Sequence, residues 1–103
     1  MDFYVYILHC ADGSYYTGHT DNLEKRIAEH ESGLLPGYTH DRRPVTLAYS
    51  ATFQTRENAL AAEFQIKRWN RAKKAALIRG DWAGVSLAGK KRFRPTIRAD
   101  RPG

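Results

Sequence analysis

Glu63 is the residue of this 103-residue chain whose position points most directly to chemistry. On a helix with about 100° per residue it falls in the arc that should be apolar, among Ala59, Leu60 and Ile66. A carboxylate in such a place is costly unless it is paired or bound to a cation. One interpretation is an ion pair with Lys67, one turn later. The other is a ligand for a divalent metal, because magnesium sites commonly combine one or two carboxylates with substrate phosphate.

Arg26 and His30 are a second candidate pair. They lie four residues apart, at the edge of the apolar arc that Leu23 and Ile27 define in an earlier helix. The opposite, solvent-facing side carries Asp21, Lys25 and Glu29 at i, i+4 spacing, so ordinary charge pairing does not explain where Arg26 lies. Arg26 and His30 are therefore predicted to face inward or across a sheet surface. The alternative is an arginine lying over the edge of the core and a histidine satisfied within it.

The start of the chain predicts a hairpin that carries tyrosines. A two-residue Asp12-Gly13 turn would place Tyr6 and Tyr16 on opposite faces. A three-residue loop, Ala11 to Gly13, ends in the glycine that a G1 bulge prefers, pairs Leu8 with Tyr16 and puts both tyrosines on one face. We predict the second register, in which two phenols, an arginine and a carboxylate converge on the sheet surface. The alternative is that these aromatic residues are simply core.

Six elements are predicted to position these side chains. Strands are expected at Phe3–Cys10, Ser14–Thr17 and Val45–Thr52, and helices at about Asn22–Glu31, about Arg56–Trp69, and from Asn70 to before Gly80. Residues 33–44 form a loop. The order ββαβαα predicts an α+β domain with a small three-stranded antiparallel sheet flanked by helices. We expect this domain to span residues 1–80, followed by a basic, loosely ordered tail at 81–103.

The charges of the chain are unevenly distributed. Residues 1–66 hold five basic and nine acidic side chains, a net −4, whereas residues 67–103 hold twelve basic and two acidic, a net +10. A basic half of this density is typical of a phosphate-rich partner. The other interpretation is a solvated helix face with a flexible tail.

Composition excludes several classes of protein. The single cysteine, Cys10, rules out a disulfide framework, and with four scattered histidines it argues against a structural zinc site. No disulfide-linked partner is expected. The uncharged run at residues 3–11 is too short to span a membrane and lacks the flanks of a signal peptide. A reducing, cytoplasmic setting is the expectation.

At its tyrosines the sequence resembles the GIY-YIG nuclease family. Tyr4-Val5-Tyr6 and Tyr16-Thr17-Gly18, ten residues apart, are similar to the paired tyrosine motifs, and Arg26, ten residues after Tyr16, to the catalytic arginine. Glu63 matches the metal-binding glutamate of the family. His30 matches a histidine that several members carry on the helix of the catalytic arginine. The resemblance covers about residues 3–78 and is strongest to the small, stand-alone bacterial branch. In this chain Tyr4 replaces a glycine, and Val5 and Thr17 replace isoleucines.

The resemblance implies a metal-dependent endonuclease that hydrolyses phosphodiester bonds in DNA. Glu63 would hold Mg²⁺ (or Mn²⁺), and Arg26 would stabilise the charge of the transition state. Tyr6 would orient or deprotonate the attacking water, aided by Tyr16 or His30. A tyrosine base would need Arg26, a lysine or the metal to lower its pKa.

The basic residues are expected to follow the nucleic-acid backbone without reading sequence. They are Lys67, Arg68, Arg71, Lys73, Lys74 and Arg79, and then Lys90, Lys91, Arg92 and Arg94. Tyr38, His40 and Trp69 are candidates to stack on bases, with Trp69 more readily packed under the last helix. Weak sequence preference and selectivity for branched, nicked or single-stranded DNA would suit a role in DNA repair or recombination.

Two rival functions follow from the same basic half. One is a non-catalytic module that binds DNA or RNA without cutting it, and the other is a partner subunit whose tail docks on an acidic protein. Binding alone does not require an inward-facing set of Tyr6, Tyr16, Arg26 and Glu63.

Overall fold

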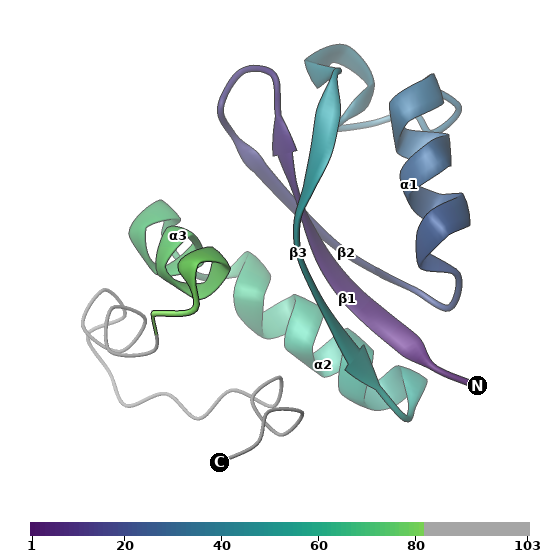
Figure 1. Ribbon diagram of the computed structural model, residues 1–103, viewed down its shortest axis with the longest axis vertical. Coiled ribbons are helices and arrows are strands. Elements are labelled where there is room, and N and C mark those ends of the chain that lie inside the picture. The colour runs from purple at the N-terminus through teal and green to yellow at the C-terminus, as the bar shows by residue number, and fades with distance from the viewer. Residues whose placement is uncertain (82–103) are drawn as a thin grey trace.

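A computed structural model describes residues 1–81 and confirms the predicted α+β class and element order. Three antiparallel strands form one sheet in the order β2-β1-β3, with β1 at Phe3–Cys10, β2 at Tyr15–Thr20 and β3 at Val45–Phe53. Helix α1 (Leu23–Ser32) lies on one side of the sheet, and α2 (Arg56–Lys67) and α3 (Arg71–Arg79) lie on the other (Figure 1). Strand β2 is thus an edge strand, and β1 is central.

The hairpin has the predicted register. Leu8 lies opposite Tyr16, and the chain reverses through residues 11–13, with Gly13 at φ +87° and a 2.8 Å hydrogen bond from the Cys10 amide to the Ser14 carbonyl. A positive φ of this size favours glycine. The second strand is longer than the predicted Ser14–Thr17, because pairing with β1 continues to Thr20, opposite Tyr4. Tyr6 and Tyr16 consequently share one face.

Side-chain caps delimit the helices. Asn22, Thr55 and Asn70 each accept a hydrogen bond from the backbone amide three residues later, and Gly33 and Gly80 end α1 and α3 in the left-handed conformation. Helix α2 ends at Lys67, two residues before the predicted end at Trp69, because the next two amides bond to carbonyls only three residues back. The loop before β3 contains one 3₁₀ turn, His40–Arg42.

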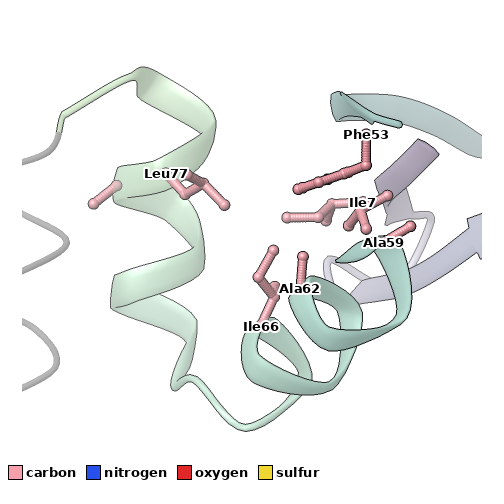
Figure 2. Close-up of a cluster of buried hydrophobic side chains, with 8 residues drawn as sticks. Ile7, Phe53, Ala59, Ala62, Ile66 and Leu77 are labelled. Carbon is pink, nitrogen blue, oxygen red and sulfur yellow. The ribbon is translucent and has the colours of Figure 1, made fainter. Parts of the chain in front are cut away.

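The sheet separates two apolar clusters. Between the sheet and α2–α3 lie Val5, Ile7, Phe53, Ala59, Ala62, Ile66, Ala76 and Leu77. Figure 2 shows Leu77 of α3 and Ile66 of α2 directed toward the side of the sheet that bears Ile7 and Phe53. On the α1 side lie Tyr6, Leu8, Cys10 and Val45, with Tyr16, Leu23 and Ile27 packed against them. The two faces of one hairpin therefore anchor different helices.

Residues 82–103 are outside the described part of the chain. The predicted division at residue 80, the basic tail, and the phosphate contacts expected of Lys90, Lys91 and Arg92 therefore stay predictions. Within residues 1–81, no helix is long and apolar enough to cross a membrane.

Thr17 carries a testable cost to stability. Its side chain is buried in β2, opposite Ile7, and its hydroxyl oxygen makes no hydrogen bond with any of the described residues. Thr17→Val keeps the shape and removes the unsatisfied hydroxyl, so we expect the free energy of unfolding to rise by about 1 kcal/mol. Urea denaturation measures this. Thr52→Val, at an exposed position of β3, is the control and should change stability by less than about 0.5 kcal/mol. A less stable Thr17→Val protein would show that the hydroxyl is satisfied.

Candidate active site

Tyr6 crosses the edge strand at the point where Gly18 lacks a side chain. Tyr6 and Gly18 are direct partners in the β1–β2 ladder, and Tyr6 is almost fully buried. A Cβ atom on Gly18 would lie 2.6 Å from the Tyr6 hydroxyl oxygen and 2.7 Å from the ring carbon that bears it. Because Tyr6 is almost fully buried and such a Cβ would overlap its phenol, the absence of a side chain at position 18 is what lets the ring lie across β2.

The Tyr6 phenol joins a hydrogen-bonded chain with His30 and Thr39. The Tyr6 hydroxyl oxygen lies 2.9 Å from His30 Nε2, and His30 Nδ1 lies 2.8 Å from Thr39 Oγ1. All three side chains are buried. A neutral imidazole has one donor and one acceptor nitrogen, so if Nδ1–H donates to Thr39, Nε2 is free to accept the Tyr6 proton. The predicted inward direction of His30 is confirmed by this burial.

Burial holds the rings of Tyr6 and His30 in their uncharged forms. Desolvation is the main cause that raises the pKa of Tyr6 above its ordinary value, and it is also the main cause that lowers the pKa of His30. Arg26 lowers the pKa of Tyr6 through its charge and a hydrogen bond, and so opposes the larger effect of burial. At His30 the charge of Arg26 lowers the pKa further, in the same direction as burial. Of the three groups that could lower the pKa of a tyrosine base, Arg26 is therefore insufficient at Tyr6, because desolvation outweighs it.

Arg26 does have an acidic partner on its own helix. Its Nε atom lies 3.2 Å from Glu29 Oε1, and Lys25 lies 3.7 Å from the other oxygen of Glu29. The expected separation of Arg26 from its opposite-sign neighbours is wrong, because its long side chain reaches Glu29 at i, i+3. It nevertheless acts electrostatically on both Tyr6 and His30, so the guanidinium lies beside the phenol–imidazole pair.

Glu63 approaches from the other side of the sheet. Its side chain, 11% exposed, contacts His19 Nδ1 through Oε1 and lies 2.7 Å from Lys67 Nζ through Oε2. The Lys67 pair is the local ion pair that the sequence analysis offered as one alternative. Leu60, expected beside Glu63 in the apolar arc, is instead exposed, because Glu63 already lies at the margin of the buried face formed by Ala59, Ala62 and Ile66.

His19 is the residue that sequence reasoning missed. It follows Gly18 on β2 and pairs with Val5, which places it on the α2 side of the sheet, opposite to Tyr6 and Tyr16. Alternation along a strand that extends to Thr20 assigns His19 to this face. The predicted strand stopped at Thr17, so this signal was lost.

The site therefore surrounds the edge strand and does not lie on one sheet surface. Tyr6, Tyr16, Arg26 and His30 are on the α1 side, and Glu63 with Lys67 is on the α2 side, which corrects the predicted convergence on a single face. The two groups nevertheless influence each other, since Glu63 contributes to the raised pKa of Tyr6 and Tyr16 to the raised pKa of Lys67. In the latter case the hydrogen bond to Glu63 is the larger cause.

The donor set around Glu63 suits a metal that keeps water or phosphate among its ligands. Within residues 1–81, no three His, Cys, Asp or Glu side chains lie together as a metal cage. Glu63 alone offers a carboxylate, and its second oxygen already holds a cation, the ammonium of half-exposed Lys67. One carboxylate that attracts a cation matches the way magnesium is held, by few protein oxygens and several other ligands. The residues thus fit such an ion.

The basic residues of α2 and α3 are not equivalent. Arg68 lies 5.3 Å over exposed Phe64, and Arg71 lies over Tyr15 while donating to the Gly13 carbonyl. Lys74 is half-buried, and its pKa is lowered by burial and by the charge of Lys67. Lys73 is only 4% exposed and covers the Trp69 ring, so its predicted phosphate contact is corrected: packing removes this ammonium from the exposed basic surface.

A tyrosine-bearing hairpin, a neighbouring arginine–histidine helix and a carboxylate across the edge strand thus meet in one small α+β domain. The GIY-YIG catalytic domain matches residues 2–76, and the chain belongs to the GIY-YIG family. The resemblance stated from the motifs is thereby confirmed.

Small proteins are similar to this chain over most of their length. A UPF0213 protein of Halobacterium salinarum is 43% identical over 75 residues, which are 73% of this chain and 97% of that protein. A UPF0213 protein of Staphylococcus saprophyticus is 48% identical over 75 residues, 73% of this chain and 92% of that protein.

Two solution NMR structures share the fold. That of a UPF0213 protein from Bacillus halodurans has a TM-score of 0.52 and 36% identity, and covers 92% of this chain and 99% of its own. The structure of a protein from E. faecalis has a TM-score of 0.56 and 32% identity. The match covers 91% of this chain and 93% of the other protein.

His30 makes the stability of the domain depend on pH. Because the folded chain lowers the pKa of His30, the unfolded chain binds more protons near and below the ordinary value of about 6.5. The contribution of His30 to the free energy of unfolding is therefore complete above that pH and declines as pH falls toward the lowered pKa. Urea midpoints at about pH 7.5 and 5.5 should differ more for wild type than for His30→Gln. The exposed His9→Gln is the control and should behave as wild type. If the urea midpoint of His30→Gln fell as much between these two pH values as that of wild type, His30 would not be the cause.

Proposed function

We propose that this protein is a metal-dependent endonuclease that hydrolyses phosphodiester bonds in DNA with little sequence specificity. Family membership supports a nuclease-type domain. The observation that carries the proposal is the buried pair of Tyr6 and His30, 2.9 Å apart, with Arg26 beside it and Glu63 across β2. A role in DNA repair or recombination belongs to the same proposal.

Tyr6 and His30 together act as the base. Water attacks phosphorus and forms a P–O bond as the bond to the leaving 3′ oxygen breaks. Tyr6 takes the proton of the water while its own proton moves to His30 Nε2, so no phenolate is needed beforehand. The lowered pKa of His30 keeps its imidazole neutral and ready to accept that proton. Thr39 fixes the orientation of the ring through Nδ1.

Charge that develops on the phosphoryl oxygens is stabilised by Arg26. Its guanidinium lies at the phenol–imidazole pair and is held by Glu29 3.2 Å away. A preformed cation aimed at developing charge costs no reorganisation when the reaction occurs.

Glu63 would hold a divalent ion, Mg²⁺ or Mn²⁺. When bound, this ion supplies Lewis-acid stabilisation of a phosphate oxygen and of the leaving oxygen. Lys67 neutralises Glu63 in the absence of the ion and, when displaced on its flexible side chain, is available to a phosphate.

Lys67, beside Glu63, and Lys74 of α3 bind the DNA backbone. Lys74 is half-buried, and among residues 1–81 the charged group that acts on it most strongly is another cation, Lys67. An anion such as a phosphate that binds between Lys67 and Lys74 would reduce the repulsion between their ammonium groups. Exposed Arg68 extends the same basic surface, which contacts phosphates and so does not distinguish sequences.

Glu63→Gln should abolish metal-dependent cleavage without unfolding the domain. With labelled single-stranded, linear and branched DNA in Mg²⁺ or Mn²⁺, we expect the cleavage rate to fall roughly 100-fold or more. EDTA should stop the wild type. Glu57→Gln, an exposed carboxylate on the first turn of the same helix, is the matched control and should retain full activity. Full activity of folded Glu63→Gln, or binding of DNA without cleavage by wild type in every metal tested, would overturn the proposal. The second result would favour a non-catalytic nucleic-acid-binding module.

Lys67→Met should bind metal more tightly than the wild type. Lys67 competes with the ion for Glu63 Oε2, and loss of a half-exposed ion pair worth up to about 1 kcal/mol corresponds to about fivefold in affinity. Mn²⁺ titration followed by electron paramagnetic resonance measures the change. Lys25→Met, which removes the equivalent i, i+4 partner of Glu29 on α1, should leave Mn²⁺ affinity unchanged. Weaker Mn²⁺ binding by Lys67→Met would contradict the assignment of Glu63 as the ligand.

A further inference from the structure

Tyr38 extends the aromatic side chains of the site outward into solvent. It lies in the loop between α1 and β3, and its ring stacks on that of Tyr16 with centroids 6.0 Å apart and planes inclined by 27°. Tyr16 in turn lies 5.2 Å from the His30 ring and 6.4 Å from the Tyr6 ring. Tyr38 is 41% exposed. A partly open aromatic ring is thus in direct contact with the candidate catalytic group.

Arg42 fixes this ring in place. Its guanidinium carbon lies 3.8 Å from the Tyr38 ring centre, and its Nη1 donates to the Tyr38 carbonyl at 2.7 Å. The same side chain donates to Asp12 in the hairpin loop at 3.0 Å, and the Arg42 carbonyl accepts from the Ala11 amide at 2.9 Å. The loop that carries Tyr38 is therefore tied to the tip of the hairpin, so the ring is preorganised at low entropic cost.

Other arginine–aromatic pairs in the described part of the chain lack this connection. Arg56 lies 4.8 Å from Phe3, Arg68 5.3 Å from Phe64 and Arg71 4.7 Å from Tyr15. None of those rings is recorded stacking on Tyr6, Tyr16 or His30, whereas Tyr38 stacks on Tyr16. An anchor for the loop alone would gain most from a buried residue, yet Tyr38, between Tyr16 and Arg42, stays partly exposed beside the reacting groups.

We propose that Tyr38, with Arg42 over its ring, is a stacking platform for an unpaired nucleobase next to the scissile phosphate, so that the substrate is DNA that is single-stranded at the cleavage position. This inference rests on the proposed function. A base inside a duplex has both faces covered by its neighbours, whereas an unpaired base has a free π face. That face can lie on the guanidinium plane of the partly exposed Arg42, which the Tyr38 ring backs from below. Stacking of this kind tolerates every base, in agreement with weak sequence preference. The Arg42 cation adds attraction to the base and the adjoining phosphate.

Binding in EDTA separates this inference from catalysis. Fluorescence anisotropy with a labelled single strand and with a blunt duplex of the same sequence, both without metal, reports binding alone. For Tyr38→Leu we expect about tenfold weaker binding of the single strand, equivalent to about 1.4 kcal/mol, and less than about twofold for the duplex. Tyr38→Trp should bind the single strand at least as tightly as wild type. The slope of affinity against salt should not change, because no charge is removed.

Phe64→Leu is the matched control. Phe64 is an exposed aromatic residue, 62% exposed, that is also covered by an arginine but has no recorded contact with Tyr16, so its loss should leave single-strand affinity unchanged. A second measurement needs no variant. A single abasic site moved along the wild-type protein's single-stranded probe should weaken binding at one position only.

Equal loss for single strand and duplex in Tyr38→Leu, or no position sensitive to an abasic site, would overturn the inference. Stacking that is present in a protein unable to cut DNA would overturn the proposed function and leave the platform standing. If wild type cleaves DNA and Tyr38→Leu binds the single strand as tightly as wild type, the stacking platform is overturned and the proposed function stands.

Discussion

The close approach of the Tyr6 ring to the backbone of Gly18 is the contact on which the site depends. A Cβ at position 18 would overlap the phenol, so the ring can cross the edge strand only there. The crossing places the hydroxyl within reach of His30 on α1, and His30 in turn holds Thr39 of the following loop. One glycine in a strand thus joins the hairpin, the first helix and the loop before β3. Glycine lowers the stability of a strand interior in general, and here that cost allows close packing.

The α1 side of the sheet holds two buried rings in their neutral forms beside Arg26, and the α2 side holds an ion pair. On the α1 side, burial favours the uncharged forms of Tyr6 and His30, which is what a proton relay needs. On the α2 side, Glu63 is held between His19 and Lys67, and its ion pair raises the pKa of Lys67. Only the single edge strand β2 lies between the two groups of side chains, so Glu63 acts electrostatically on Tyr6, and Tyr16 on Lys67. The net −4 of residues 1–66 and +10 of residues 67–103 do not follow this division, because Glu63 and His19 of the α2 side both lie in the first part.

Sequence reasoning succeeded where short-range rules apply. The loop of residues 11–13 set the register of Leu8 opposite Tyr16, and Asn22, Thr55 and Asn70 capped helices as their residue types indicate. It failed where a long side chain or a distant element decides. Arg26 turned toward Glu29, Lys73 was covered by packing over Trp69, and Leu60 was left exposed. Helical periodicity gives the direction of a Cβ atom, not the path of a lysine or arginine side chain beyond it.

By itself the amino-acid sequence determined the order of the elements, the shared face of Tyr6 and Tyr16, and the membership of the family, because turn chemistry, alternation and motif spacing are local properties of the chain. Only the tertiary structure decided that Glu63 approaches from the opposite face, that His19 is its partner 44 positions away, and that desolvation outweighs Arg26 at the Tyr6 phenol. Those outcomes depend on which faces of the hairpin α1 and α2 cover and on how much water they exclude. Burial and long-range proximity are sums over the whole fold, so no single segment of the sequence contains them.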